Sequence, residues 1–150
     1  MTGEFRFVVR DTDSRLNVRE RFAVEEWIKS GTEVHAMHDH MHHFKMLNGG
    51  MWGATQSSCV RDVLLKNMNN DLSYQADNTV IAPIYTQCNV FDHTSYLCKN
   101  WTHTFPTRRS SNLEHAGQVF DANDKPHMSD MDEMPYVEPQ CRKKKEWLYG

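Results

Sequence analysis

The fold of this chain is decided by the stretch FRFVVRDTDSRL, residues 5–16. Its first half is aromatic and β-branched, which is typical of a strand packed into a sheet. The polar cluster that follows ends the strand, so Asp11 and Asp13 are expected at its C-terminal end. Ligands of open α/β sheets bind outside that end of the strands. The stretch therefore predicts both a sheet strand and the position of a binding site.

Asp11 and Asp13 lie two residues apart on a predicted turn, so both carboxylates can reach one cation. Mg²⁺ and Mn²⁺ prefer oxygen ligands, and proteins often hold them with one or two carboxylates together with substrate phosphates. The same Asp-x-Asp pattern also occurs in ordinary turns, where the side chains bond to the backbone. The residues alone leave two interpretations, a divalent-metal site and a turn.

Size and composition indicate one globular domain. The chain has 150 residues, of which 39% are hydrophobic and 25% charged, and this is ordinary for a domain with a core. Its formal net charge of -3 gives no electrostatic reason for a nucleic-acid partner or an acidic membrane. The basic run at residues 142–145 is expected to be a solvated end. No apolar run approaches the ~20 residues that span a membrane.

The four cysteines are expected to be reduced thiols. Cys59, Cys88, Cys98 and Cys141 are widely separated and form no Cys-x-x-Cys pair, which argues against zinc-ribbon and thioredoxin-like sites. The N-terminal residues also lack the apolar segment of a secretory signal. Together these features predict a cytoplasmic protein.

Beyond the first strand, the pattern of apolar residues predicts alternating helices and strands. Asn17 and Glu20 form nearly a capping box, so a helix is expected over residues 18–29. Further helices are expected at 59–68 and 74–84, and strands at 33–37, 90–91 and 117–120. This order predicts an α/β domain over residues 1–125, with a short parallel or mixed sheet and flanking helices. Residues 126–150 are expected to be an irregular tail.

Five histidines lie between His35 and His43 and form a second candidate site. Imidazole suits zinc and nickel, so the cluster is compatible with a non-catalytic metal-binding or interaction module. Its spacing matches no standard structural zinc pattern, and no cysteine is near. A polar loop with histidines facing water is the alternative, and both interpretations stay open.

A glycine-rich segment, GGMWG at residues 49–53, follows the histidines. Three glycines in five residues indicate a backbone that turns tightly or is approached closely by another group. The segment is not a P-loop, because no Lys-Ser/Thr pair follows it.

Taken in order, these motifs resemble a family of glycosyltransferase-like proteins. The matching motifs are RDTDSRLN at 10–17, RE at 19–20, AVEEW at 23–27, MHDH at 37–40 with His43, GGMWG at 49–53 and GQVFD at 117–121. The family pattern is an Arg-Asp-x-Asp-Ser-Arg strand end, an Arg-Glu helix with a Val-x-x-Trp face, an Arg-Asp-His-Pro-x-x-His-like loop and Gly-Gly-Met-Trp-Gly. The similarity covers roughly residues 5–125. His38 stands where the family usually has Arg, and Met41 where it often has Pro.

The resemblance implies a GT-A fold, which is Rossmann-like, and metal-dependent transfer of a sugar from a nucleotide-diphosphate sugar to a glycan acceptor. The matched positions assign Asp11, Asp13 and His93 to the metal, which would be Mn²⁺ or Mg²⁺. They assign Arg10, Arg15, His40, Gly49, Gly50 and Trp52 to substrate binding, and Asp39 and Asp77 to catalysis as candidate general bases.

The resemblance further implies that residues 1–125 correspond to the C-terminal half of such a domain. In the family, a preceding half holds the nucleotide base. A half alone would expose a sheet edge and an apolar face, so a homodimer or pairing with a missing N-terminal half is expected. Little activity is expected from the chain alone, because binding energy that positions the donor would be lost.

Overall fold

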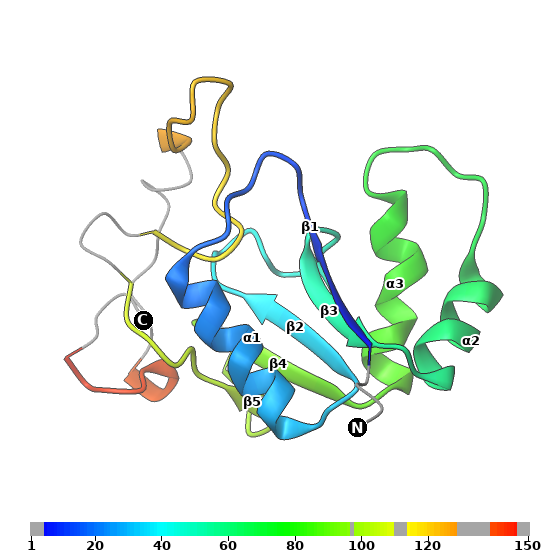
Figure 1. Cartoon of the computed structure of the whole chain (residues 1–150), viewed down its shortest axis with the longest axis horizontal. Helices are drawn as coiled ribbons and strands as arrows, with labels where there is room; N and C mark the ends of the chain where they lie inside the picture. Colours follow the sequence, from blue (N-terminus) through cyan, green and yellow to red (C-terminus); the bar gives the residue numbers. More distant parts are fainter. Residues whose placement is uncertain (1–4, 97, 110–113, 129–138, 147–150) are drawn as a thin grey trace.

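The computed structural model describes residues 5–96, 98–109, 114–128 and 139–146. Figure 1 shows a sheet with helices beside it. The strands are β1 (Arg6–Arg10), β2 (Val34–His38), β3 (Met51–Thr55), β4 (Val90–Thr94) and β5 (Thr102–His103). The helices are α1 (Val18–Ser30), α2 (Ser58–Asn67), α3 (Ala76–Gln87) and the short 3-10 helix η1 (Pro139–Cys141).

Within the described residues, the strands form one mixed sheet in the order β1-β3-β2-β4-β5. β3 runs antiparallel to both β1 and β2, whereas β2, β4 and β5 are parallel to one another. This confirms the predicted α/β class and mixed sheet. β3 was not predicted, and the strand expected at 117–120 is reduced to two isolated bridges, Ser14 to Val119 and Phe120 to Pro126.

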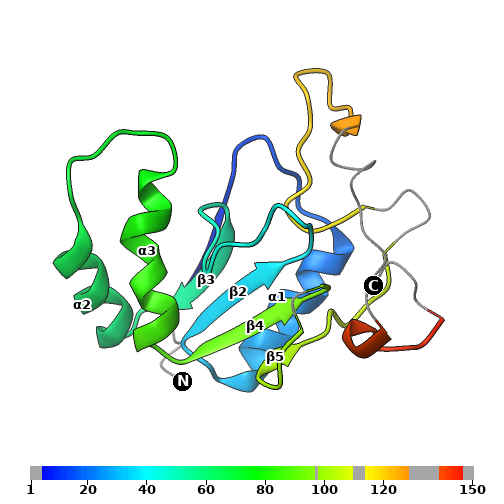
Figure 2. The same ribbon diagram turned by 180° about the vertical axis from the view of Figure 1, so that it is seen from behind.

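The two faces of the sheet carry separate cores, because successive side chains of a strand point to opposite faces. On one face Val34, Ala36 and Trp52 pack with residues of α2 and α3. On the other face Met37 and Met51 pack with Ala23 of α1. Figures 1 and 2, seen from opposite sides, agree that α1 lies across β2 and β4 on its own face.

Local capping explains why α1 forms where it was predicted. The Asn17 side chain accepts a hydrogen bond from the Glu20 backbone N–H at 2.8 Å, which satisfies one free donor of the first turn. Gly31 ends the helix with φ of 70°, and its N–H donates to the Ile28 carbonyl at 3.3 Å. Trp27 is 1% exposed and stacks on His35 of β2, so it is a core residue.

Among helices of the described ranges, none has the length and apolar composition needed to cross a membrane.

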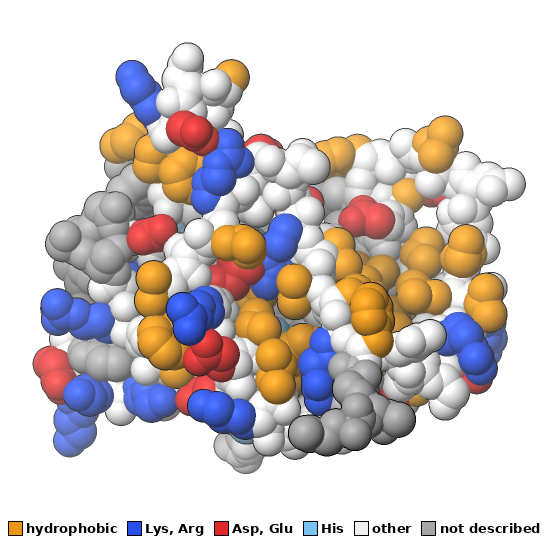
Figure 3. All heavy atoms as spheres, viewed as in Figure 1, with side chains coloured by type: hydrophobic (Ala, Val, Ile, Leu, Met, Phe, Trp, Pro, Cys, Tyr) orange, Lys and Arg blue, Asp and Glu red, His pale blue; other side chains and the backbone are white. Residues whose placement is uncertain are grey.

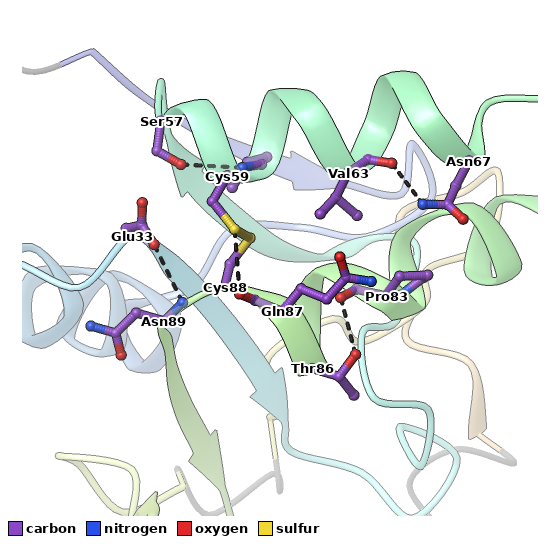
Figure 4. Close-up of a disulfide and its surroundings, with 11 residues drawn as sticks. Glu33, Ser57, Cys59, Val63, Asn67, Pro83, Thr86, Gln87, Cys88 and Asn89 are labelled. Atoms are coloured by element: carbon purple, nitrogen blue, oxygen red, sulfur yellow. Dashed lines mark hydrogen bonds between the residues drawn. A yellow bond between two sulfur atoms is a disulfide. The ribbon is translucent and has the colours of Figure 1, made fainter.

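The prediction of four reduced thiols is wrong, because the structure contains the disulfides Cys59–Cys88 and Cys98–Cys141. Figure 4 shows the first of them joining the first turn of α2 to the residue that follows α3. Sequence spacing did not reveal these pairs, since the fold brings residues 29 and 43 positions apart to Cα separations of 5.9 and 5.5 Å. Such separations suit a disulfide. The cytoplasmic location stays a prediction.

The C-terminal tail is less loose than expected in the part that the structure describes. Cys141 in η1 is 2% exposed and is bonded to Cys98, so this segment is fixed against the domain. Residues 129–138 and 147–150, also predicted to be irregular, lie outside the described residues.

The Cys59–Cys88 bond is expected to contribute about 3 to 4 kcal/mol to the free energy of unfolding, as the chain-entropy model gives for its loop. Urea unfolding of the Cys59→Ser/Cys88→Ser double variant should therefore show a loss of this size against the oxidised wild type. Thiol titration of the oxidised, unfolded wild type should detect no free thiol. Detection of four thiols without reductant would contradict both bonds.

Candidate functional site

A cleft of about 550 Å³ opens where β1 ends, and its volume lies in the range of small-molecule sites. Four segments line most of it: residues 11–13 after β1, residues 42–45 between β2 and β3, residues 48–51 leading into β3, and residues 74, 75, 77 and 78 around the start of α3. Figure 1 shows these segments at the same end of the molecule, because α3 begins beside the end of β1. The cleft lies outside the C-terminal end of β1, where the sequence places its candidate site.

Three carboxylates line the cleft: Asp11, Asp13 and Asp77. Partial burial raises the pKa of Asp11, and the negative charges of Asp13 and Asp77 raise it further, against a smaller opposing effect of Arg10. Figure 3 shows acidic side chains at the surface between the end of β1 and the start of α3. Negative charges near a carboxylate favour its protonated form, and a bound cation would relieve the same repulsion.

The glycine pair before β3 separates two of these carboxylates. A Cβ atom on Gly50 would lie 2.2 Å from the Asp11 carboxyl carbon, and one on Gly49 would lie 2.1 Å from Asp77 Oδ2. The Gly49 N–H also donates to Asn78 Oδ1 at 3.0 Å. A side chain at either position would therefore displace the facing carboxylate, which is the close approach that the sequence suggested.

The Asp-Thr-Asp turn is closed by hydrogen bonds to its main-chain carbonyls rather than to its carboxylates. The backbone N–H and the hydroxyl of Ser14 donate to the main-chain carbonyl of Asp11 at 3.2 and 2.8 Å. The Phe120 N–H donates to the main-chain carbonyl of Asp13 at 2.8 Å, which anchors the strand-like segment around Val119 beside the turn. The turn thus presents two carboxylates to the cleft while its backbone supplies the structural bonds.

Asp39, a predicted catalytic residue, is fully buried and does not line the cleft. Arg19 donates to both of its oxygens, at 2.8 and 2.9 Å, and Arg109 donates to Oδ1 at 2.6 Å. The Ala116 N–H donates to Oδ2 at 2.8 Å. Burial alone would raise the pKa of Asp39, but the charges of Arg109 and Arg19 outweigh it and hold the pKa well below its usual range. A carboxylate bound in this way is suited to joining segments rather than to accepting a proton.

The predicted substrate residues divide into two groups. Gly49 and Gly50 line the cleft. Arg10 instead bonds to Glu20 of α1 and to the Val9 carbonyl, and Arg15 pairs with Asp124 at the surface. Two further members are packed inside: Trp52 contacts Phe7 in the core, and His40 stacks on His115 at 4.9 Å.

His93, assigned to the metal by the resemblance, lies in the sheet and is 0% exposed. One ring nitrogen is 2.8 Å from the ring nitrogen of His35, and the other is 3.1 Å from Glu26 Oε2. Burial lowers the pKa of His93 to about 4, although the bond to Glu26 raises it. This histidine is therefore neutral at physiological pH and is not among the residues of the cleft.

The other histidines of the cluster also find partners inside the protein. His38 bonds to Asp92 at 2.8 Å and to the Lys45 carbonyl at 2.7 Å. His42 and His43 line the cleft, and burial with the nearby rings of His115 and His40 lowers the pKa of His43 to about 3. In the part of the chain that the structure describes, no three His, Cys, Asp or Glu side chains are placed to hold a metal ion.

Sequence reasoning missed several residues of the cleft. They are Asn48, Tyr74, Gln75 and Asn78, together with Phe44 and Lys45. Most of them come from connections between elements, where a single sequence gives no periodic signal, whereas Asn78 lies in the first turn of α3. Their common feature is proximity to the Gly-Gly pair or to the start of α3.

Comparison with known proteins gives no relative for this chain. No family model matches it, and neither a curated protein nor a solved structure does so.

Proposed function

We propose that the cleft binds the diphosphate of a nucleotide sugar through Mn²⁺ or Mg²⁺ held by Asp11 and Asp13. In this proposal the chain is a glycosyltransferase-like protein of the GT-A type that transfers the sugar to a glycan acceptor. The observation that carries it is the convergence of three carboxylates on one cleft at the C-terminal end of β1. The family resemblance of the same motifs supports it.

The donor set fits a hard divalent cation. Asp11 and Asp13 supply oxygen ligands from one turn, and a third carboxylate lies across the same cleft. An ion on two carboxylates would take its other ligands from water and phosphate, which is usual for Mg²⁺. When bound, the metal would neutralise negative charge on the leaving diphosphate. Lys45, which also lines the cleft, would add a positive charge toward the phosphates.

Asp77 is the general base in this proposal. It lies in the first turn of α3, lines the cleft and faces Gly49. As an acceptor hydroxyl oxygen bonds to the anomeric carbon, the carbon–oxygen bond to the diphosphate breaks and the diphosphate keeps the electron pair. The hydroxyl proton passes to the Asp77 carboxylate. This step inverts the anomeric configuration.

Replacing Asp13 by alanine is expected to weaken Mn²⁺ binding at least tenfold, about 1.4 kcal/mol, because one of two carboxylate ligands is lost. Asp13 is exposed, so the variant should fold. Calorimetric titration of Mn²⁺ into wild type and variant measures the change. Asp62→Ala, which removes an exposed carboxylate of α2, is the matched control and should bind like the wild type.

Equal affinity of the Asp13→Ala variant and the wild type would contradict the metal site.

A second candidate function is a non-catalytic metal-binding or interaction module. It rests on the grouping of the His40, His42, His43 and His115 rings, whose contacting pairs have centroids 4.9 to 6.2 Å apart. If His42→Gln abolishes binding while Asp13→Ala preserves it, the non-catalytic histidine module is favoured.

A further inference from the structure

The cleft has aromatic side chains at its edge as well as carboxylates. Phe44, between β2 and β3, is 62% exposed, and Tyr74, just before α3, is 93% exposed. Both line the same cleft as Asp77. Figure 3 shows hydrophobic side chains projecting from the connection between α2 and α3, the segment to which Tyr74 belongs. Exposed aromatic rings beside polar groups suit a ligand that has an apolar face and a polar edge.

We infer that Phe44 and Tyr74 form a binding subsite for a neutral saccharide. A pyranose ring has a C–H face that packs on an aromatic ring, and its hydroxyls lie around the edge. The inference rests on the proposed function, in which this saccharide is the acceptor and Asp77 is the base. It adds the residues that hold the acceptor ring.

Amide side chains around the two rings match the hydroxyls of a sugar. Asn48, Gln75 and Asn78 line the cleft, and an amide side chain carries both donors and an acceptor. Two of the amide oxygens already accept one bond each, that of Asn78 from the Gly49 N–H and that of Asn48 from the Lys45 N–H. A sugar hydroxyl is also both donor and acceptor, so the two kinds of group are complementary. Gln75 and Asn78 flank Asp77 in the chain, which places the hydroxyl-binding groups next to the proposed base.

The backbone at Gln75 has a conformation that is rare for this residue type. Gln75 has φ of 64° and ψ of 17°, in the left-handed region, and its side chain does not cap α3. Hydrogen bonds from Ala76 N–H to the Ser73 carbonyl and from Asn78 N–H to the Gln75 carbonyl, both 3.1 Å, fix the turn. Strained residues of this kind are concentrated at ligand-binding positions, and Gln75 lies next to Tyr74 in the lining of the cleft.

The charge of the cleft favours a neutral ring over an anionic one. Three carboxylates and Lys45 line it, so an anion without an accompanying cation is repelled. A neutral saccharide carries no such penalty. It should therefore bind in the absence of any metal, whereas a nucleotide should not.

Saturation-transfer NMR in EDTA tests this subsite, with lactose, maltose, cellobiose and N,N′-diacetylchitobiose as probes. We expect at least one of these disaccharides to bind the wild-type chain. Tyr74→Ala and Phe44→Ala should each weaken that binding about five- to tenfold, the effect of losing one aromatic contact. Phe5→Ala is the matched control, because Phe5 is 63% exposed and does not line the cleft.

Any of these results would overturn the inference: no binding of any of the four disaccharides, equal binding by wild type and both cleft variants, or an equal loss in Phe5→Ala. Tyr74-dependent binding of uridine or guanosine in place of the sugars would assign the rings to a nucleobase and also overturn it. Because EDTA removes the metal, the result does not depend on the Mn²⁺ titration. Saccharide binding without Mn²⁺ binding would refute the proposed transferase while leaving the subsite in place.

Discussion

Replacing Asp39 by alanine is expected to lower the free energy of unfolding by about 3 to 5 kcal/mol. The variant leaves two guanidinium groups, those of Arg19 and Arg109, buried without their shared carboxylate. It also leaves the Ala116 N–H without its acceptor. Domains are stable by only about 5 to 15 kcal/mol, so this change removes a large part of the total. Urea unfolding followed by circular dichroism measures it.

Glu25→Ala is the control for Asp39→Ala, because Glu25 forms an ion pair with Arg21 on the exposed side of α1. Exposed pairs at this helical spacing contribute about 0.3 to 0.5 kcal/mol, so the control should be nearly neutral. An Asp39→Ala variant that unfolds at the same urea concentration as the control would show that the buried ion group does not stabilise the fold.

Acidification from pH 6.5 to 4 is expected to destabilise the protein by several kcal/mol. His93 is buried and its folded-state pKa is about 4, below the usual 6.5 of an unfolded chain. In this pH window the unfolded state binds a proton that the folded state does not bind, so the free energy of unfolding falls as the pH falls. His93 alone accounts for about 3 kcal/mol at pH 4. Burial also lowers the pKa of His35 well below its usual value, which adds in the same direction.

His38 acts in the opposite direction and limits the effect. Burial would lower its pKa, but the hydrogen bond to Asp92 outweighs burial and raises it. Its contribution is therefore complete below pH 6.5 and is lost as the pH rises through the folded-state value. Because His93 and His35 both oppose it, the net change on acidification remains a loss.

Urea unfolding at pH 7, 6, 5 and 4 measures this pH dependence. His93→Gln should reduce the slope of unfolding free energy against pH by up to one proton, about 1.4 kcal/mol per pH unit. His127→Gln, which replaces an exposed histidine outside the sheet, is the matched control for the substitution. The same slope in wild type and His93→Gln would show that His93 binds its proton equally in the folded and unfolded states, so that burial does not lower its pKa.

Elements with local signals were predictable from the sequence. The Asn17 cap and Gly31 determine where α1 begins and ends through bonds within a few residues. β3 has no comparable signal, because Gly53 interrupts it and its pattern does not alternate. The reason for Gly53 is non-local: a Cβ there would lie 2.8 Å from the Phe7 carbonyl oxygen and 3.3 Å from Trp27. Only the folded sheet brings these groups together.

Pro83, Asp39 and His93 also have structural settings that could not be predicted from local sequence. Pro83 was expected to end the third helix near residue 84, yet α3 continues to Gln87. One proline removes a single helical bond, and Ile81 and Ile84 pack the surrounding turns into the core. For Asp39 and His93 the chemistry of the side chain could be read from the sequence, but its burial could not. Tertiary contacts decided that both are enclosed.

The candidate site was predictable where function and backbone geometry coincide. Asp11 and Asp13 follow a recognisable strand, and the Gly-Gly pair signals close approach, so these four positions were found together. Asp77 joined them only through the family resemblance, because it depends on where α3 begins. Phe44 and Tyr74 had no signal, since exposed aromatic residues in connections occur in many unrelated proteins.

The close approach of the glycine pair to two carboxylates has a consequence for how this sequence can diverge. A Cβ at Gly50 would overlap the Asp11 carboxylate, and a Cβ at Gly49 would overlap the Asp77 carboxylate. A lineage that replaces one of these glycines and keeps its acid must move that carboxylate away from its present position. We expect homologues in which one glycine has been replaced to carry a shorter or displaced side chain at the paired acid. The four positions should therefore be inherited as two coupled pairs, and a drift at one member would mark the loss of the site.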